Sequence, residues 1–273
     1  MPDPDARSDP ARPLSMALLE CDHVDADLRH IAGDYADMFT RLFTEHAPEV
    51  TLERVDVVGG APLPALGAHD GLLITGSRQS VGDDLPWIRD LGGLLVRAHA
   101  RAVPVVGICF GHQLIAHALG GRVDRAPVGW GVGVHHGTVT APRAWMTPAR
   151  SGFDLLVSHQ DQVTAIPNGA TVLATSEHAP VAAFEMGSLV GFQGHPEFVA
   201  DYAEALMARR IERIGAERIE HARGTLGRPT DQATVTRWIE SFLAGNRDGV
   251  GAPPGDRRSI STVPTTRPAP PGR

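Results

Sequence analysis

The cysteine at position 109 lies in a sequence context typical of a nucleophile. An apolar, β-rich run, VPVVGI at 103–108, leads into Gly107-Ile108-Cys109-Phe110-Gly111, and a helical stretch, HQLIAHALGG, follows at 112–121. Glycine-x-nucleophile-x-glycine is the pattern of a strained strand-to-helix turn. Such a turn exposes the sulfur at the carboxyl edge of a sheet and at a helix N-terminus, whose dipole favours the thiolate. The alternative interpretation is a small buried hydrophobic residue, which many cysteines are.

A histidine and a glutamate two residues apart have the types that such a cysteine needs as base and orienting acid. The strand-like run LVGFQG at 189–194 leads into His195-Pro196-Glu197, and a helix is predicted shortly afterwards. Residues i and i+2 of extended backbone point to the same side, and Pro196 biases His195 toward that conformation. Glu197 would then fix the tautomer of the imidazole while its other nitrogen faces Cys109. The alternative is an ordinary surface turn.

The elements that must position these residues follow from short apolar runs that alternate with amphipathic stretches. Up to residue 121, strands are predicted at 16–21, 50–57, 71–76 and 103–108, and helices at 27–46, 85–100 and 112–121. Beyond it, strand-like runs lie at 132–140, 153–159, 171–176, 181–186 and 189–194, and helices at 199–215 and 231–244. We therefore predict an α/β fold with an open, mostly parallel sheet flanked by helices and a small antiparallel sheet insertion.

The two ends of the chain differ in composition from its body. Residues 1–14 and 245–273 are rich in proline and charged or small polar residues and show no periodicity, so both are predicted to be disordered tails around one catalytic domain at 15–244. The first residues lack the basic patch and apolar run of a signal peptide, and no apolar run approaches the roughly 20 residues of a spanning helix. We therefore expect a cytoplasmic protein without a membrane partner.

Charge and residue usage exclude several kinds of chemistry. The 273-residue chain has a net charge of −7 and contains no lysine, so Schiff-base and P-loop enzymes are excluded, and its scattered arginines argue against a nucleic-acid partner. Cys21 ends an apolar run without a glycine turn and is predicted to be a core residue. His135 and His136 alternate sides of a strand, which is poor geometry for a metal. No cofactor and no metal are therefore expected.

The motif G-I-C-F-G-H-Q followed far downstream by G-H-P-E resembles the signature of the class I glutamine amidotransferases. The resemblance extends over roughly residues 16–215, is closest to stand-alone GMP-synthase-like members, and includes similarity to plant γ-glutamyl peptidases. It implies a flavodoxin-like core and a catalytic set of Cys109, His195 and Glu197. It also implies an oxyanion hole formed by the backbone N–H of Phe110 and by a backbone N–H near Gly76. The residues that it implies in substrate contacts are Gln113, Ser158, His159, Gln160 and Asp161.

The implied activity is hydrolysis of the glutamine side-chain amide through a γ-glutamyl thioester, with ammonia passed to a separate synthase. Two departures from the family pattern bear on this activity: Gly76-Ser77-Arg78 replaces a glycine pair or Gly-Pro, and Gln160 replaces a glycine. The first leads to the hypothesis that Arg78 pairs with a substrate carboxylate, the alternative being a solvated loop cation. The second keeps a γ-glutamyl peptidase or hydrolase open as the alternative function. A catalytically silent binding module and a serine-hydrolase-type esterase are less favoured.

Overall fold

The computed structural model describes residues 12–247. The strands are β1 (Leu14–Glu20), β2 (Val50–Asp56), β3 (Gly71–Ile74), β4 (Val105–Ile108), β5 (Arg122–Arg125), β6 (Gly131–Val139), β7 (Gly152–His159), β8 (Asp161–Ala165), β9 (Thr171–Thr175), β10 (Ala183–Met186) and β11 (Leu189–Phe192). The helices are α1 (Arg29–Ala32), α2 (Tyr35–His46), α3 (Pro86–Ala100), α4 (Phe110–Ala118), α5 (Ala200–Arg209), α6 (Ile211–Ile214), α7 (Ala216–Arg223) and α8 (Gln232–Asn246). The alternation of these strands and helices along the chain confirms the predicted α/β fold.

The main sheet has nine strands within this part of the chain, in the order β2-β1-β3-β4-β11-β10-β9-β6-β7. The strands from β2 to β11 in this order pair in parallel, whereas β10, β9, β6 and β7 continue the same sheet with antiparallel pairing. The separate small sheet is the antiparallel pair β5 and β8. The sequence did not predict these two strands, which are short and mostly polar; Val123 and Val163 are paired with each other in the register.

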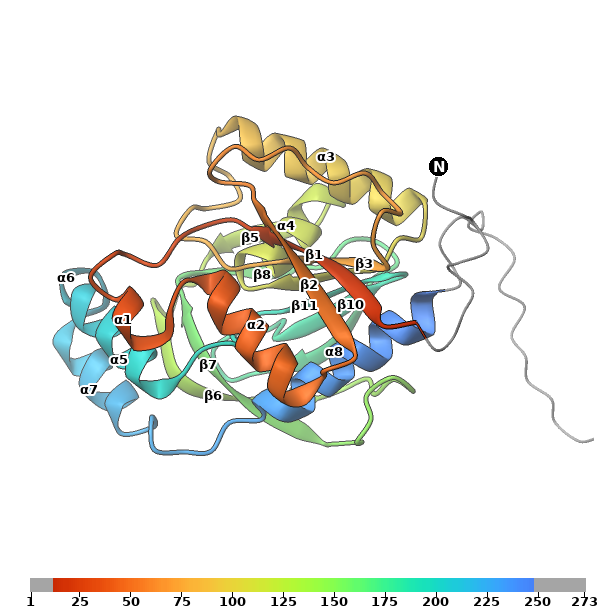
Figure 1. Cartoon of the computed structure of the whole chain (residues 1–273). Coiled ribbons are helices and arrows are strands. Elements are labelled where there is room, and N and C mark those ends of the chain that lie inside the picture. Colours follow the sequence, from red (N-terminus) through yellow and green to blue (C-terminus); the bar gives the residue numbers. More distant parts are fainter. Residues whose placement is uncertain (1–11, 248–273) are drawn as a thin grey trace, which may run out of the picture.

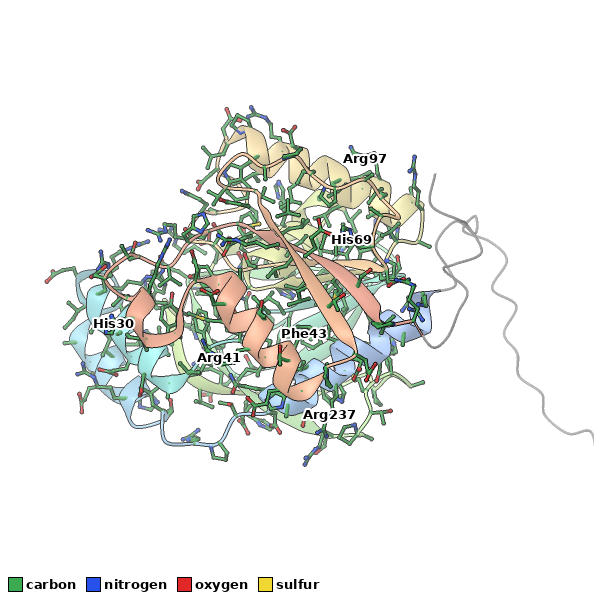
Figure 2. The ribbon with its side chains drawn as sticks, in the orientation of Figure 1. His30, Arg41, Phe43, His69, Arg97 and Arg237 are labelled. Atoms are coloured by element: carbon green, nitrogen blue, oxygen red, sulfur yellow. The ribbon has the colours of Figure 1, made fainter. Side chains whose placement is uncertain are left out.

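Helices cover both faces of the parallel part of the sheet (Figure 1). Alternate residues of β1 enter two different cores: Met16 and Leu18 pack in the cluster that includes α2 and α8, whereas Ala17 and Leu19 pack in the cluster that includes α3 and α4. In Figure 2, Arg97 of α3 and Arg237 of α8 project from opposite sides of the molecule, outside these two layers. The parallel strands are therefore buried on both faces, which explains their continuous apolar runs.

Two helical predictions differ from the structure in where the helices end. The stretch 27–46 is divided at Gly33, which has a φ of 81°, and α2 then starts with a capping box in which Asp34 and Asp37 exchange side-chain and backbone hydrogen bonds. The stretch 199–215 is divided into α5 and α6 near Arg210. A local cap thus outweighs continuous helical periodicity at the first of these sites.

The described elements extend slightly beyond the predicted domain of 15–244, since β1 begins at Leu14 and α8 ends at Asn246. The remainder of the two predicted tails, residues 1–11 and 248–273, lies outside the described residues. Within residues 12–247, none of the helices combines the length and the apolar character needed to cross a membrane.

Candidate active site

Cys109 lies in a strained turn between β4 and α4. Its φ is 50° and its ψ is −97°, a conformation that non-glycine residues rarely adopt. Glycines on either side make the turn possible, because a Cβ at Gly107 would lie 2.4 Å from the carbonyl carbon of Gly111, and one at Gly111 would lie 2.6 Å from the carbonyl oxygen of Ile74. The predicted strand–turn–helix around Cys109 is therefore present, and the backbone N–H of Phe110 belongs to the first turn of α4.

His195 reaches the same place because its strand lies beside that of the cysteine. β11 pairs in parallel with β4, Ile108 is in register with Phe192, and the backbone N–H of Cys109 donates to the carbonyl of Phe192 over 2.8 Å. The chain then bends across β7, where the N–H of His195 donates to the carbonyl of Leu156, also over 2.8 Å. Two neighbouring parallel strands thus carry Cys109 and His195 to one edge of the sheet.

The imidazole of His195 is held by two neighbours that follow it in the chain. Its Nδ1 is 2.7 Å from Oε1 of Glu197, and its ring stacks on Phe198 with centroids 3.9 Å apart and an angle of 13° between the planes. All three side chains are buried. The predicted i, i+2 pair is therefore formed in the interior, and the surface-turn alternative is wrong.

The electrostatics of the site favour a charged imidazole. Burial lowers the pKa of His195, but the negative charges of Glu197 and Cys109, with their hydrogen bonds, outweigh burial and raise the pKa to about 10. At neutral pH the ring therefore carries both protons, with Nδ1–H directed at Glu197 and Nε2–H available to the sulfur. An imidazolium held in this way can deliver a proton to a leaving group beside the sulfur.

The turn after β3 lies against both residues. A Cβ at Gly76 would be 2.9 Å from Cε1 of His195 and 3.8 Å from Cβ of Cys109, so a side chain here would displace the imidazole. The hydroxyl of Thr75 donates to the carbonyl of Gly76 over 3.0 Å, which fixes the plane of the peptide between residues 76 and 77. The N–H of Ser77 points away from that carbonyl, because the peptide is trans. This turn therefore has the position that the sequence predicted for the oxyanion loop.

Arg78, in the same turn, is engaged by the protein itself. Its Nε lies 2.9 Å from Oδ2 of Asp22, its Nη1 is 3.1 Å from Asp25, and its Nη2 donates to the carbonyl of His23 over 2.7 Å. The backbone N–H of Arg78 also donates to Asp22. The hypothesis that Arg78 pairs with a substrate carboxylate is therefore replaced by a structural role: it ties the turn to the end of β1, where the sequence offered no sign of a partner.

A pocket opens over Cys109. Its lining includes the predicted substrate residues together with side chains from the segment after β3, from α6 and from Arg210 just before it: Ser77, Arg78, Gln79, Ser80, Asp83, Cys109, Gln113, Arg125, Trp130, Ser158, His159, Gln160, Asp161, Arg210 and Arg213. Burial holds the pKa of His159 well below its ordinary value, so this ring is neutral. The structure thus brings Gln113 and residues 158–161 to the pocket of the nucleophile candidate, as the sequence predicted.

Two contacts in and beneath this pocket were not predicted from the sequence. Gln193 is buried, and its Nε2 lies 3.5 Å from the sulfur of Cys109. Its place two residues before His195 was the available signal, since the i, i+2 rule also applies to this pair. The guanidinium groups of Arg210 and Arg213 lie 5.7 and 5.3 Å from the centroid of Trp130, and no sequence pattern indicated this contact.

Other candidate residues have structural surroundings. Cys21 is fully buried, as predicted for a core residue. Among residues 12–247, one group has metal-type ligand atoms close together: Glu20, His23 and Asp56. Its buried carboxylate, Glu20, already accepts hydrogen bonds from Arg54 and from the backbone of Ala36. The charge that a cation would neutralise is thus already paired.

Comparison with known proteins identifies the family. The model of the family "Glutamine amidotransferase class-I" matches residues 39–211. The chain belongs to the class I glutamine amidotransferases. "Gamma-glutamyl peptidase 5" of Arabidopsis thaliana is 33% identical over 189 residues, which cover 67% of this chain and 73% of that protein. A "GMP synthase [glutamine-hydrolyzing]" of Thermomicrobium roseum is 39% identical over 133 residues, 46% of this chain and 23% of that protein.

A crystal structure of a glutamine amidotransferase from Thermotoga maritima has the same fold. Its TM-score is 0.66 at 19% sequence identity, and the match covers 85% of this chain and 97% of that one. Because these relatives are glutamine amidotransferases and γ-glutamyl peptidases, this amidotransferase-family chain is an enzyme. The predicted resemblance is thereby confirmed at the level of the family.

Proposed function

We propose that this class I amidotransferase hydrolyses the side-chain amide of glutamine, with Cys109 as nucleophile, His195 as acid and base, and Glu197 as the group that orients His195. One observation carries the proposal: a cysteine in a positive-φ strand-to-helix turn lies beside a buried His195–Glu197 pair. A strained turn of this kind persists only where surrounding structure enforces it, and such turns cluster at active sites.

In the first half of the reaction, the Cys109 thiolate attacks the amide carbon and a C–S bond forms. The oxyanion accepts hydrogen bonds from the N–H of Phe110 and from the turn at Gly76. Nε2 of His195 gives its proton to the amide nitrogen, the C–N bond breaks, and ammonia leaves. A γ-glutamyl thioester remains on the cysteine.

In the second half, the now neutral His195 takes a proton from water, and the resulting hydroxide attacks the thioester carbon. The C–S bond breaks, so that glutamate and the Cys109 thiolate are released and His195 is again protonated. Glu197 accepts from Nδ1 throughout and stabilises the imidazolium. The cycle needs neither a metal nor a cofactor.

The substrate's amino-acid end would lie in the pocket among Gln113, Ser158, His159, Gln160 and Asp161. The amide nitrogen of Gln113 already donates to the carbonyl of Asp161, so its own carbonyl oxygen is the group left to accept a hydrogen bond from the substrate ammonium. The ammonia would go to a separate synthase, a proposal that the GMP synthase relatives support.

The test is mass spectrometry of the protein with glutamine, combined with ammonia release. We expect a γ-glutamyl adduct on Cys109 and ammonia production in the wild type, and neither in Cys109→Ala. Cys21→Ala is the matched control and should retain both. An unmodified Cys109 and no ammonia, with correctly folded protein, would contradict the proposal.

A second function, hydrolysis of γ-glutamyl peptides, is favoured by one feature of the pocket. Arg210 donates to the hydroxyl of Ser158 over 3.0 Å, and Arg213 contacts Trp130, but within residues 12–247 neither has a carboxylate partner. The other two arginines of the pocket lining, Arg78 and Arg125, do have acidic partners. Two guanidinium groups on the wall would suit a donor with a carboxylate in its leaving group, as the γ-glutamyl peptidase relatives suggest.

The two functions separate in a substrate comparison. If peptides are the substrate, Arg213→Gln should raise KM for a γ-glutamyl dipeptide by roughly tenfold and leave KM for glutamine nearly unchanged. Arg237→Gln, on the outer side of α8, is the control (Figure 2). Equal effects on both substrates would remove the support for the peptidase.

A further inference from the structure

A chain of hydrogen bonds connects the pocket wall to the sulfur of Cys109. The side-chain nitrogen of Gln113 donates to the carbonyl of Asp161 over 2.7 Å and to Oε1 of Gln193 over 3.2 Å. Nε2 of Gln193 then donates to Sγ of Cys109 over 3.5 Å. The side chains of both glutamines and of the cysteine are at least 95% buried, so solvent competes little for these hydrogen bonds.

The direction of every hydrogen bond in this chain follows from its first member. A backbone carbonyl can only accept, so Gln113 must turn its NH₂ group toward Asp161. The second hydrogen of that NH₂ group requires an acceptor, so Gln193 must turn its carbonyl oxygen toward Gln113. Gln193 is then left with its NH₂ group facing the sulfur. The sulfur is thereby placed as an acceptor, and a thiolate accepts more strongly than a thiol.

The backbone of Gln193 is held as firmly as its side chain. It follows β11 directly, and its N–H donates to the carbonyl of Ala182 over 2.9 Å. Because β11 also pairs with β4, which carries Cys109, the two residues are fixed on neighbouring strands. The contact between amide and sulfur therefore does not depend on a mobile loop.

We propose that Gln193 is a positioning residue that holds the sulfur of Cys109 as a hydrogen-bond acceptor and so favours the thiolate. In the proposed reaction, the proton that the thiol gives up is carried by Nε2 of His195. Gln113 acts through Gln193, because its hydrogen bond fixes the orientation of the Gln193 amide. The inference deepens the proposed function, because a thiolate is the nucleophile of that reaction, but its test needs no turnover.

Other charged or titratable groups around Cys109 remain in place when Gln193 is changed. His195, backed by Glu197, is the nearest of them; the others belong to α4, to β7 or to the pocket rim: His112, His159, Arg78, Asp83, Arg125, Asp161, Arg210 and Arg213. Burial lowers the pKa of His112 to about 4 and also keeps His159 neutral. A difference between Gln193 variants therefore reports the amide rather than these groups.

The experiment measures the alkylation rate of Cys109 by iodoacetamide as a function of pH, followed by mass spectrometry of the intact chain and its peptides. Cys21, which is fully buried, serves as an internal reference that should stay unmodified. In Gln193→Met, which keeps the length of the side chain and removes the donor, we expect the pH midpoint of alkylation to rise by about one unit and the rate near pH 6.5 to fall about tenfold.

Three further variants make the result decisive. Gln113→Met should give a smaller shift in the same direction, because Gln193 keeps its amide but loses the group that orients it. Gln162→Met, at another buried glutamine, is the matched control and should leave the midpoint unchanged. If Gln193→Met does not fold, Gln193→Asn, which withdraws the amide from the sulfur, should show the same rise.

An unchanged midpoint in a folded Gln193 variant would overturn the inference. So would an equal shift in Gln162→Met, since the effect would then be a general response of the core. A wild-type protein that alkylates at low pH but does not hydrolyse glutamine would contradict the proposed substrate and leave the role of Gln193 standing.

Discussion

Two parallel strands of this protein end in a cysteine at the same edge of the sheet, yet the two thiols lie in different chemical surroundings. Cys21 follows β1, is fully buried, and its sulfur lies 3.5 Å from the carbonyl of Leu19; burial raises the pKa of this thiol. Cys109 follows β4 but lies in a positive-φ turn between His195 and Gln193. Both residues are cysteines that follow a parallel strand. The difference in their surroundings therefore comes from the turn at Cys109 and from the strand that lies beside β4.

The comparison is tested most directly by removing each thiol. Cys109→Ala should lower amide hydrolysis by at least about 10⁴-fold, because the proposed nucleophile is lost. Cys21→Ala should keep the wild-type kcat/KM and affect only stability. The measurement is ammonia release under identical conditions, and substantial activity in Cys109→Ala would mean that the two sites do not differ as described.

The interaction that holds His195 beside Cys109 can be weakened without changing the cysteine. Glu197→Gln should reduce kcat by about 10²–10⁴-fold, since the amide no longer stabilises the imidazolium or enforces its tautomer. Glu204→Gln on α5, which has an exposed ion pair with Arg223, is the control and should change kcat little. A pH–rate profile of both variants checks the reason: the limb due to His195 should move to lower pH in Glu197→Gln only.

The crowded glycine turn around Cys109, which Cys21 lacks, can be tested by its effect on the free energy of unfolding. Gly107→Ala places a Cβ 2.4 Å from the backbone of Gly111, so we expect a loss of about 3 kcal/mol in the free energy of unfolding, together with loss of activity. Gly120, unlike Gly107, has a positive φ and nothing within 4 Å of a Cβ, so Gly120→Ala should cost about 1 kcal/mol of backbone strain alone. Chemical denaturation of both variants gives the comparison, and similar losses would show that crowding does not define the turn.

The smallest expected effect is a pH dependence of stability. His195 has its pKa raised from 6.5 to about 10, so by itself it contributes stability that is fully present below pH 6.5 and is lost as the pH rises to about 10. In Cys109→Ala, Glu197 is the remaining charge that raises the pKa of His195, so the free energy of unfolding should fall as the pH rises above 6.5, by less than about 1.4 kcal/mol per pH unit.

Urea unfolding at several pH values across this range measures the effect. Adding Glu197→Gln to Cys109→Ala should flatten the curve, because the remaining charge that raises the His195 pKa is gone. A Cys109→Ala variant whose stability does not change above pH 6.5 would contradict the raised pKa of His195.

The sequence predicted the parts of the site that depend on local geometry. The glycines around Cys109 and the His195-Pro196-Glu197 segment each report a constraint within a few residues, and the structure has the expected turn and pair. The strands β5 and β8 were missed because their pairing, between segments about 40 residues apart, supplies stability that four or five mostly polar residues do not signal. Arg78 was misjudged for a related reason: its partners Asp22 and Asp25 are distant in the sequence and become neighbours only when β1 and β3 pair.

The position of β11 has a consequence for when this enzyme can become active during synthesis. A nascent chain that has emerged through α4 contains β1 to β4 and Cys109, but β4 is then an open edge of the sheet and His195 is still 86 residues away along the chain. Only when β11 inserts between β4 and β10 does the thiol gain its histidine and its amide donor. A truncated or stalled chain that ends before β11 therefore carries Cys109 without His195 and Gln193 beside it.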